Sequence, residues 1–160
     1  MGMIGKLLRI SEAELQQLQA NEEDISDFIY SEDSEKKELD IDKAWHGIHY
    51  VLNKSAWEGE LPLFNTIMSG TPIGEDMGYG PVRFLTGAEV KEVAAALADL
   101  SEEELQRRFD PEEMNDLDIY PSLDWSQAEE PEYIFSYLKE VRNYYLEAAG
   151  SGQAMLLYTI

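Results

Sequence analysis

Ala154-Met155-Leu156-Leu157-Tyr158-Thr159-Ile160 is the stretch that decides the fold of this chain. It is apolar at almost every position, without the polar alternation of a strand that has one face in water. A strand of this composition is covered on both faces. We therefore expect residues 154–160 to lie inside a sheet and not at its edge.

Two other segments are predicted to supply strands. Ile4–Ile10 has Leu8 on the same face as its two end isoleucines, at period two, and Leu7 on the other face. Val82–Leu85 follows Pro81, which lacks an amide hydrogen and fits the start or edge of a strand. The sheet must then pair both chain ends with the middle of the chain. The sequence predicts an α+β fold, with a small central mixed sheet that includes the N- and C-terminal strands and is flanked by several helices.

Helix starts are marked by capping signals. In a capping box a Ser or Thr hydroxyl accepts from a first-turn amide, and a Glu three residues later binds back. Such boxes occur at Ser11/Glu14, Thr86/Glu89 and Ser101/Glu104, and Asp110-Pro111 has an N-cap followed by a first helical residue. The longest helix is predicted from Pro131 to about Ala149, with Gly150 as its stop.

The remaining segments give weaker signals. Asp42 suits an N-cap, and a helix is predicted from there to about Leu52. Ser31–Lys37 is interpreted as an exposed loop, and Gly70–Pro81 as a glycine-rich loop. Leu63–Met68 is apolar but too short to be assigned to a helix or a strand.

Composition narrows the functional classes. The chain has 160 residues and is interpreted as one domain, residues 1–160. It has 33 Asp and Glu against 12 Lys and Arg, a net charge of −21, which should repel nucleic acids and anionic membranes. There is no cysteine and no apolar run long enough for a membrane helix, and the first residues do not read as a secretory signal. We expect a cytoplasmic protein.

Candidate chemistry is sparse. Asp42, His46 and His49 would share one helix face, a spacing that metal sites use, but no fourth ligand is indicated. We expect His49 to border the core, His46 to face solvent, and no metal or cofactor to bind. The glycine-rich loop precedes a strand, carries Glu75 and Asp76 and lacks the lysine of a phosphate loop. No serine-nucleophile signature occurs. The sequence leaves open whether the protein is an enzyme and favours that it is not.

The chain resembles the YfbM-like proteins, a bacterial family of unknown function. Four separated motifs carry the resemblance, in the same order: Met1-Gly2-Met3-Ile4-Gly5, Leu39-Asp40-Ile41-Asp42-Lys43-Ala44-Trp45-His46-Gly47-Ile48-His49, Gly78-Tyr79-Gly80-Pro81-Val82-Arg83 and Asp118-Ile119-Tyr120-Pro121. The resemblance implies a bacterial, cytoplasmic, single-domain protein with helices around a small sheet, and it supplies no activity. It points to seven positions: Asp40, Asp42, Trp45, His49, Tyr79, Arg83 and Tyr120.

Three functions are compatible with these observations. The first is an acidic module that binds a basic protein partner, as immunity proteins and antitoxins do. The alternative is a small-ligand-binding protein or enzyme with a pocket near His49, Trp45, Tyr79 and Arg83. Mimicry of nucleic acid ranks last, because the acids are spread over many helices. The oligomeric state is not indicated.

Overall fold

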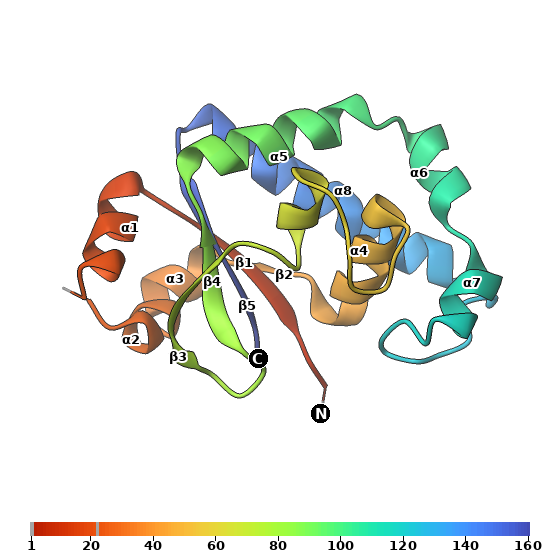
Figure 1. The fold of residues 1–160 in the computed structure, drawn as a ribbon, viewed down its shortest axis with the longest axis horizontal. Coiled ribbons are helices and arrows are strands. Elements are labelled where there is room, and N and C mark those ends of the chain that lie inside the picture. The colour runs from red at the N-terminus through yellow and green to blue at the C-terminus, as the bar shows by residue number, and fades with distance from the viewer. Residues whose placement is uncertain (1, 22) are drawn as a thin grey trace.

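The centre of the molecule is one five-stranded sheet in the order β2-β1-β5-β4-β3 (Figure 1). The structure is a computed structural model that describes residues 2–21 and 23–160. All strand pairs in this sheet are antiparallel. The strands are β1 (Gly5–Ile10), β2 (Leu39–Asp40), β3 (Thr71–Asp76), β4 (Pro81–Leu85) and β5 (Ala154–Thr159).

Helices surround the sheet and also form most of the chain between strands. The α-helices are α1 (Glu12–Gln19), α2 (Ile25–Ile29), α3 (Glu32–Lys37), α4 (Trp45–Asn53), α5 (Gly87–Asp99), α6 (Glu102–Arg108), α7 (Pro111–Asp116) and α8 (Glu130–Gly150). Two 3-10 turns, η1 (Asp42–Ala44) and η2 (Leu63–Thr66), accompany them. Among the described residues, no helix is both long enough and apolar enough to cross a membrane.

The strand formed by the C-terminal stretch is central, as predicted. β5 lies between β1 and β4, and its residues 154–158 are buried. The two chain ends run side by side, since Ile4 and Ile160 exchange backbone hydrogen bonds of 2.8 and 3.0 Å. The expected α+β fold with both terminal strands in one sheet is therefore confirmed. The sheet is wholly antiparallel in the described chain, whereas the sequence had suggested a mixed one.

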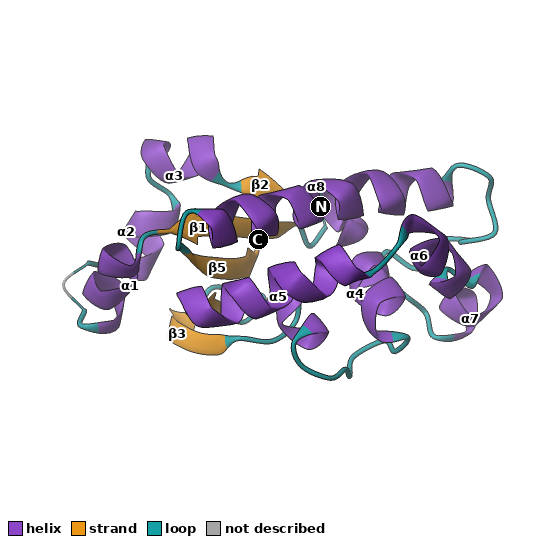
Figure 2. Cartoon of the chain, turned by 90° about the horizontal axis from the view of Figure 1, so that it is seen from above, coloured by secondary structure: helices purple, strands orange, loops and turns teal. Residues whose placement is uncertain are grey.

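The two faces of the sheet carry separate cores. Leu7, Leu85 and Leu157 pack with α4, α5 and α8 in the larger core. Leu8 and Leu156 point the other way and pack with residues of α1 and α2 in a smaller core. Successive strand residues alternate between faces, which explains why neighbours in sequence belong to different cores. Figures 1 and 2 show α5 and α8 crossing one side of the sheet together, with α1, α2 and α3 gathered at one end.

Most predicted helix starts are confirmed. Both capping boxes at Ser11 and Thr86 form completely, and Asp110 caps α7 with Pro111 in its first turn. Ser101 accepts from the Glu104 amide, but the reciprocal contact is missing. The Glu104 carboxylate instead binds Arg107 and Arg108 on the next turn.

Three predictions of local structure are wrong. Ser31–Lys37 is not a loop, because Ser31 caps the short helix α3. The segment from Gly70 to Pro81 contains strand β3, which pairs with β4 and forms an edge of the sheet. Asp42 does not cap α4. Its φ of 50° is not helical, so the chain makes the 3-10 turn first and α4 begins at Trp45.

Candidate functional site

The candidate site is a hollow of about 470 Å³ on the face of the sheet that carries the larger core. Its floor follows from strand register, since Leu157 of β5 pairs with Leu7 on one side and with Arg83 on the other. Residues directly opposite in a sheet share a face, so these three side chains lie in one row. The walls come from the start of α4, from the segment between α4 and β3, and from the β3–β4 hairpin.

The wall formed by α4 depends on Gly5 of β1. A Cβ atom at Gly5 would lie 2.9 Å from the Cβ of Trp45, too close for a real contact. The indole nitrogen of Trp45 donates to the Met3 carbonyl at 2.9 Å, which fixes the ring beside the N-terminal strand. The first residues of the chain therefore position Trp45 against the sheet, where it lines the pocket.

An aromatic row stands behind this wall. Tyr120 stacks on Trp45 with ring centroids 5.3 Å apart, and Trp45 stacks on His46 at 5.1 Å. His46 in turn lies 4.4 Å from the ring of Trp57. Trp57 ends the row and is 63% exposed at the rim of the pocket. A large apolar side chain held in place yet open to water is typical of a contact surface.

The opposite rim is the tip of the β3–β4 hairpin. Gly78 and Gly80 adopt φ values of 112° and 97°, a region that side chains with a Cβ rarely enter. The Asp76 carboxylate accepts from the Gly78 amide at 2.7 Å and from the Gly80 amide at 3.3 Å. This turn leaves Tyr79 54% exposed beside the pocket.

Arg83 is the charged group of the pocket. One guanidinium nitrogen donates to the Ser69 carbonyl at 2.6 Å, and Arg83 forms no ion pair with any described residue. Burial lowers the pKa of Arg83, and the nearby Tyr145 opposes that shift. An arginine keeps its charge in proteins, so a partly buried cation with only a carbonyl partner faces the pocket's interior.

A second basic residue, Lys6, borders the same pocket, but its charge is neutralised by an ion pair. Lys6 makes a 2.6 Å ion pair with Glu38, whose other oxygen accepts from the Tyr158 hydroxyl. Lys6 pairs across the sheet with Tyr158, which belongs to the smaller core. The Lys6 ammonium therefore belongs to the other face, and Arg83 is the uncompensated cation among the described pocket residues.

Both histidines are buried, which corrects the expectation that His46 faces solvent. His46 is 1% exposed: its Nδ1 accepts from the Tyr120 amide at 2.7 Å, so its Nε2 donates to the Ala56 carbonyl at 2.8 Å. Nε2 of His49 likewise donates to the Glu58 carbonyl at 3.0 Å, and its Nδ1 accepts from Asn53. Burial lowers the pKa of His46, and that of His49 to about 4. Both rings are neutral structural bridges.

The described residues contain no group of three His, Cys, Asp or Glu placed to hold a metal ion. Asp42 turns instead toward α8, where its carboxylate accepts from the Tyr133 hydroxyl at 2.8 Å. The Asp40 carboxylate accepts from the Asp42 amide at 2.8 Å. The two acids thus shape the turn between β2 and α4.

The structure brings together three of the seven positions singled out from the sequence. Trp45, Tyr79 and Arg83 line the pocket, whereas His49 lies one layer behind its wall residue Phe64. Tyr120 supports Trp45 from behind, and Asp40 and Asp42 lie outside. Sequence reasoning missed several lining residues: Met3, Trp57, Phe64 and Met68. The exposed tryptophan in an irregular, polar segment was the one signal that could have pointed to Trp57.

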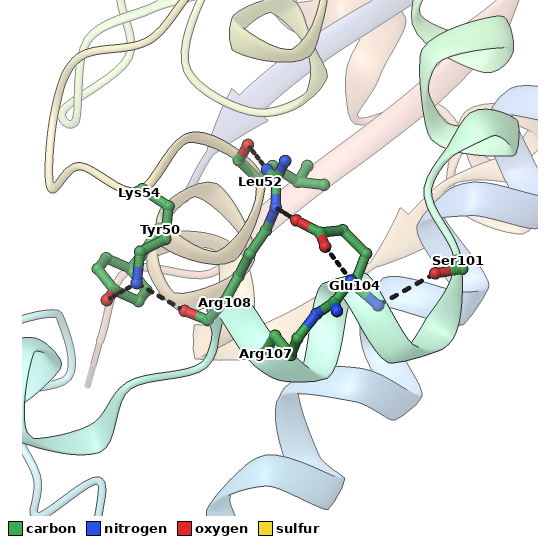
Figure 3. Close-up of polar contacts among 7 residues, drawn as sticks. All are labelled: Tyr50, Leu52, Lys54, Ser101, Glu104, Arg107 and Arg108. Carbon is green, nitrogen blue, oxygen red and sulfur yellow. Dashed lines mark hydrogen bonds and ion pairs between the residues drawn. The ribbon is translucent and has the colours of Figure 1, made fainter.

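A second polar cluster ties α4 to α6 and α7, away from the pocket (Figure 3). Lys54 donates to the Tyr50 hydroxyl at 2.6 Å and to the Arg108 carbonyl at 2.9 Å, while Arg108 donates to the Leu52 carbonyl. The Tyr50 hydroxyl donates to Glu113. Burial, and then this hydrogen bond, raise the pKa of Tyr50, so its phenol stays protonated and cannot serve as a base. The cluster closes the C-terminal end of α4.

Known proteins are similar to this chain in sequence and in fold. A family described as a domain of unknown function, DUF1877, matches residues 1–158. Protein YfbM of Escherichia coli (strain K12) is 31% identical over 147 residues, covering 88% of this chain and 86% of that protein. The crystal structure of YfbM, a protein of unknown function from Escherichia coli, superimposes with a TM-score of 0.76 and 21% identity. That superposition covers 98% of this chain and 99% of the other.

Proposed function

We propose that this chain, which belongs to the DUF1877 family of domains of unknown function, binds a small molecule in the pocket above β1, β5 and β4. The observation that carries the proposal is the convergence of Trp45 from α4 with Tyr79 and Arg83 from the β3–β4 hairpin on one hollow of about 470 Å³. Small-molecule sites are concave, mostly apolar, and contain few polar groups.

The arrangement of the walls supports a site that is formed before the ligand arrives. Trp45 is fixed by the Met3 carbonyl and by two stacking neighbours, and Arg83 is fixed by the Ser69 carbonyl. Fixed side chains lose little conformational entropy when a ligand binds. The exposed Trp57 and Tyr79 remain available at the rim.

A thermal-shift screen of small metabolites tests this proposal with a matched pair of variants. Tyr79 and Tyr30 are similarly exposed, at 54% and 51%, but only Tyr79 borders the pocket. Compounds that raise the Tm of the wild type should raise that of Tyr30→Ala equally and that of Tyr79→Ala much less. A screen without stabilising compounds, or one whose hits stabilise Tyr79→Ala fully, would contradict the proposal.

A basic protein partner is the second candidate. The net charge of −21 would steer such a partner, and Trp57 and Leu61 lie on one exposed segment, 63% and 66% accessible. Partner binding of this kind would weaken with added salt and with Trp57→Ala. The pocket ranks first because it also contains Arg83, which is fixed by the Ser69 carbonyl and forms no ion pair with a described residue.

A further inference from the structure

We propose that the ligand of this pocket is a monocarboxylate with an apolar body, whose carboxylate pairs with Arg83. The inference rests on the proposed function and names the chemical class of its ligand. It follows from the charges that the chain places in the pocket and from those it keeps out.

The pocket excludes the chain's most abundant charged residues. The chain has 33 Asp and Glu among 160 residues, yet none of the described residues lining the pocket is acidic. Acidic residues are nevertheless close in sequence to the lining residues. Asp40 and Asp42 flank Ile41, Glu58 follows Trp57, and Asp76 precedes the hairpin tip. The pocket therefore has the opposite electrostatic character to the rest of the molecule.

Arg83 retains donors for an anion. A guanidinium has five N–H groups in a planar fork that fits a carboxylate with two parallel hydrogen bonds. In this structure one nitrogen of Arg83 donates to the Ser69 carbonyl, and no other acceptor among the described residues is hydrogen-bonded to this side chain. A cation removed from water is costly unless it is paired. Since no described residue places a carboxylate beside Arg83, the counter-charge comes from the ligand.

The charge count favours a single negative charge on that ligand. Lys6 is paired with Glu38, so among the described lining residues Arg83 is the one cation available to neutralise an anion. A phosphate carries close to two charges and is usually held by several donors or by a helix N-terminus. A second charge would remain unpaired, inside a protein of net charge −21 that repels it.

The rest of the ligand is apolar because the walls are. Trp45, Phe64, Ile67 and Met68 surround the space above Leu157. The exposed aromatic side chains of Trp57 and Tyr79 line its rim. Such walls gain free energy by burying hydrocarbon or a ring, with the polar group fixing orientation at one end.

Calorimetric titration with naphthylacetate and with its neutral isostere naphthylacetamide tests the inference. The wild type should bind the carboxylate roughly tenfold or more tightly than the amide, as expected for a charge-assisted pair. Arg83→Gln should remove that preference and keep a donor for the Ser69 carbonyl. Arg83→Lys should retain part of it, because lysine keeps the charge but not the planar fork.

Arg142→Gln is the control, since it changes the net charge equally. Arg142 lies in a separate groove between α6 and α8 and forms no ion pair with a described residue. The Arg142→Gln variant should bind both probes with the same affinity as the wild type. Equal binding of the two probes to the wild type would overturn the carboxylate inference and leave small-molecule binding standing. Failure of both probes to bind would overturn both proposals.

Discussion

At the scale of single residues, the two histidines show how a pattern that suggests chemistry can serve structure. His46 and His49 each bridge a backbone carbonyl with one ring nitrogen and accept a hydrogen bond with the other. A proton added to Nδ1 of His46 would face the Tyr120 amide hydrogen. Protonation therefore breaks a contact in both cases, in addition to charging a buried ring.

This arrangement predicts that both histidines titrate below the ordinary pKa of 6.5, and that the pKa of His49 is about 4. The unfolded chain then binds more protons than the native one as pH falls below 6.5. The histidine contribution to the free energy of unfolding is complete above 6.5 and decreases toward pH 4, by about 1.4 kcal/mol per unit of pKa difference.

An NMR titration of the ring protons measures this directly, because the chain contains only two histidines. The His49 resonance should stay at its neutral position at pH 6, and the midpoint of the His46 resonance should lie below 6.5. A midpoint at the value of a free imidazole for either ring would show that it is exposed, contrary to the structure. A comparison of unfolding curves for wild type and His49→Gln across the same range isolates its share of the stability change.

At the scale of elements, the site depends on the contact between β1 and α4. Gly5 allows the helix to lie close to the strand, with Trp45 and Ile41 directly over it. Gly5→Ala should displace Trp45, lower the free energy of unfolding by roughly 1–3 kcal/mol and weaken ligand binding in the pocket.

Gly150→Ala is the control for that change. Gly150 is the last residue of α8, and a Cβ there would meet nothing within 4 Å. Alanine is the better helix former, so stability should stay the same or rise by under about 1 kcal/mol. Chemical denaturation of both variants gives the comparison. Equal stability of Gly5→Ala and wild type would contradict the close packing of α4 on β1.

The helices and strands that could be predicted are those marked by a local sequence pattern. β5 could be recognised from its apolar run, and β1 from alternation that separates Leu7 from Leu8. The capping signals located α1, α5 and α7. β3 was missed because Ile73 is its one large apolar residue, which leaves no alternating pattern, and because it is paired only along one edge, with β4. Whether such a segment becomes a strand depends on its pairing with another strand, and local sequence patterns do not reveal that pairing.

The same limit applies to the site. Tyr79 and Arg83 could be grouped because they are four residues apart, and Trp45 was singled out by its motif. Trp57 joins them through a tertiary contact with the His46 ring, and Leu157 joins them because β5 lies beside β4. His49 was placed in the pocket from sequence, but its ring packs behind Phe64.

At the scale of the whole molecule, the protein is strongly acidic, but none of the described residues that line the pocket is acidic. The pocket is completed by both ends of the chain, with Met3 and Gly5 from one end and Leu157 and Thr159 from the other. The antiparallel pairing of β1 with β5 brings those ends together. The site therefore exists only in the complete fold, and its positive centre stands out against a net charge of −21.

A crystal structure of this protein with naphthylacetate bound tests that claim most directly. We expect the probe's carboxylate at hydrogen-bond distance, about 3 Å, from the Arg83 guanidinium, with the ring system between Trp57 and Tyr79. The contradicting result is a probe seated in the groove beside Lys139 and Arg142, or an Arg83 already paired with a carboxylate of its own chain.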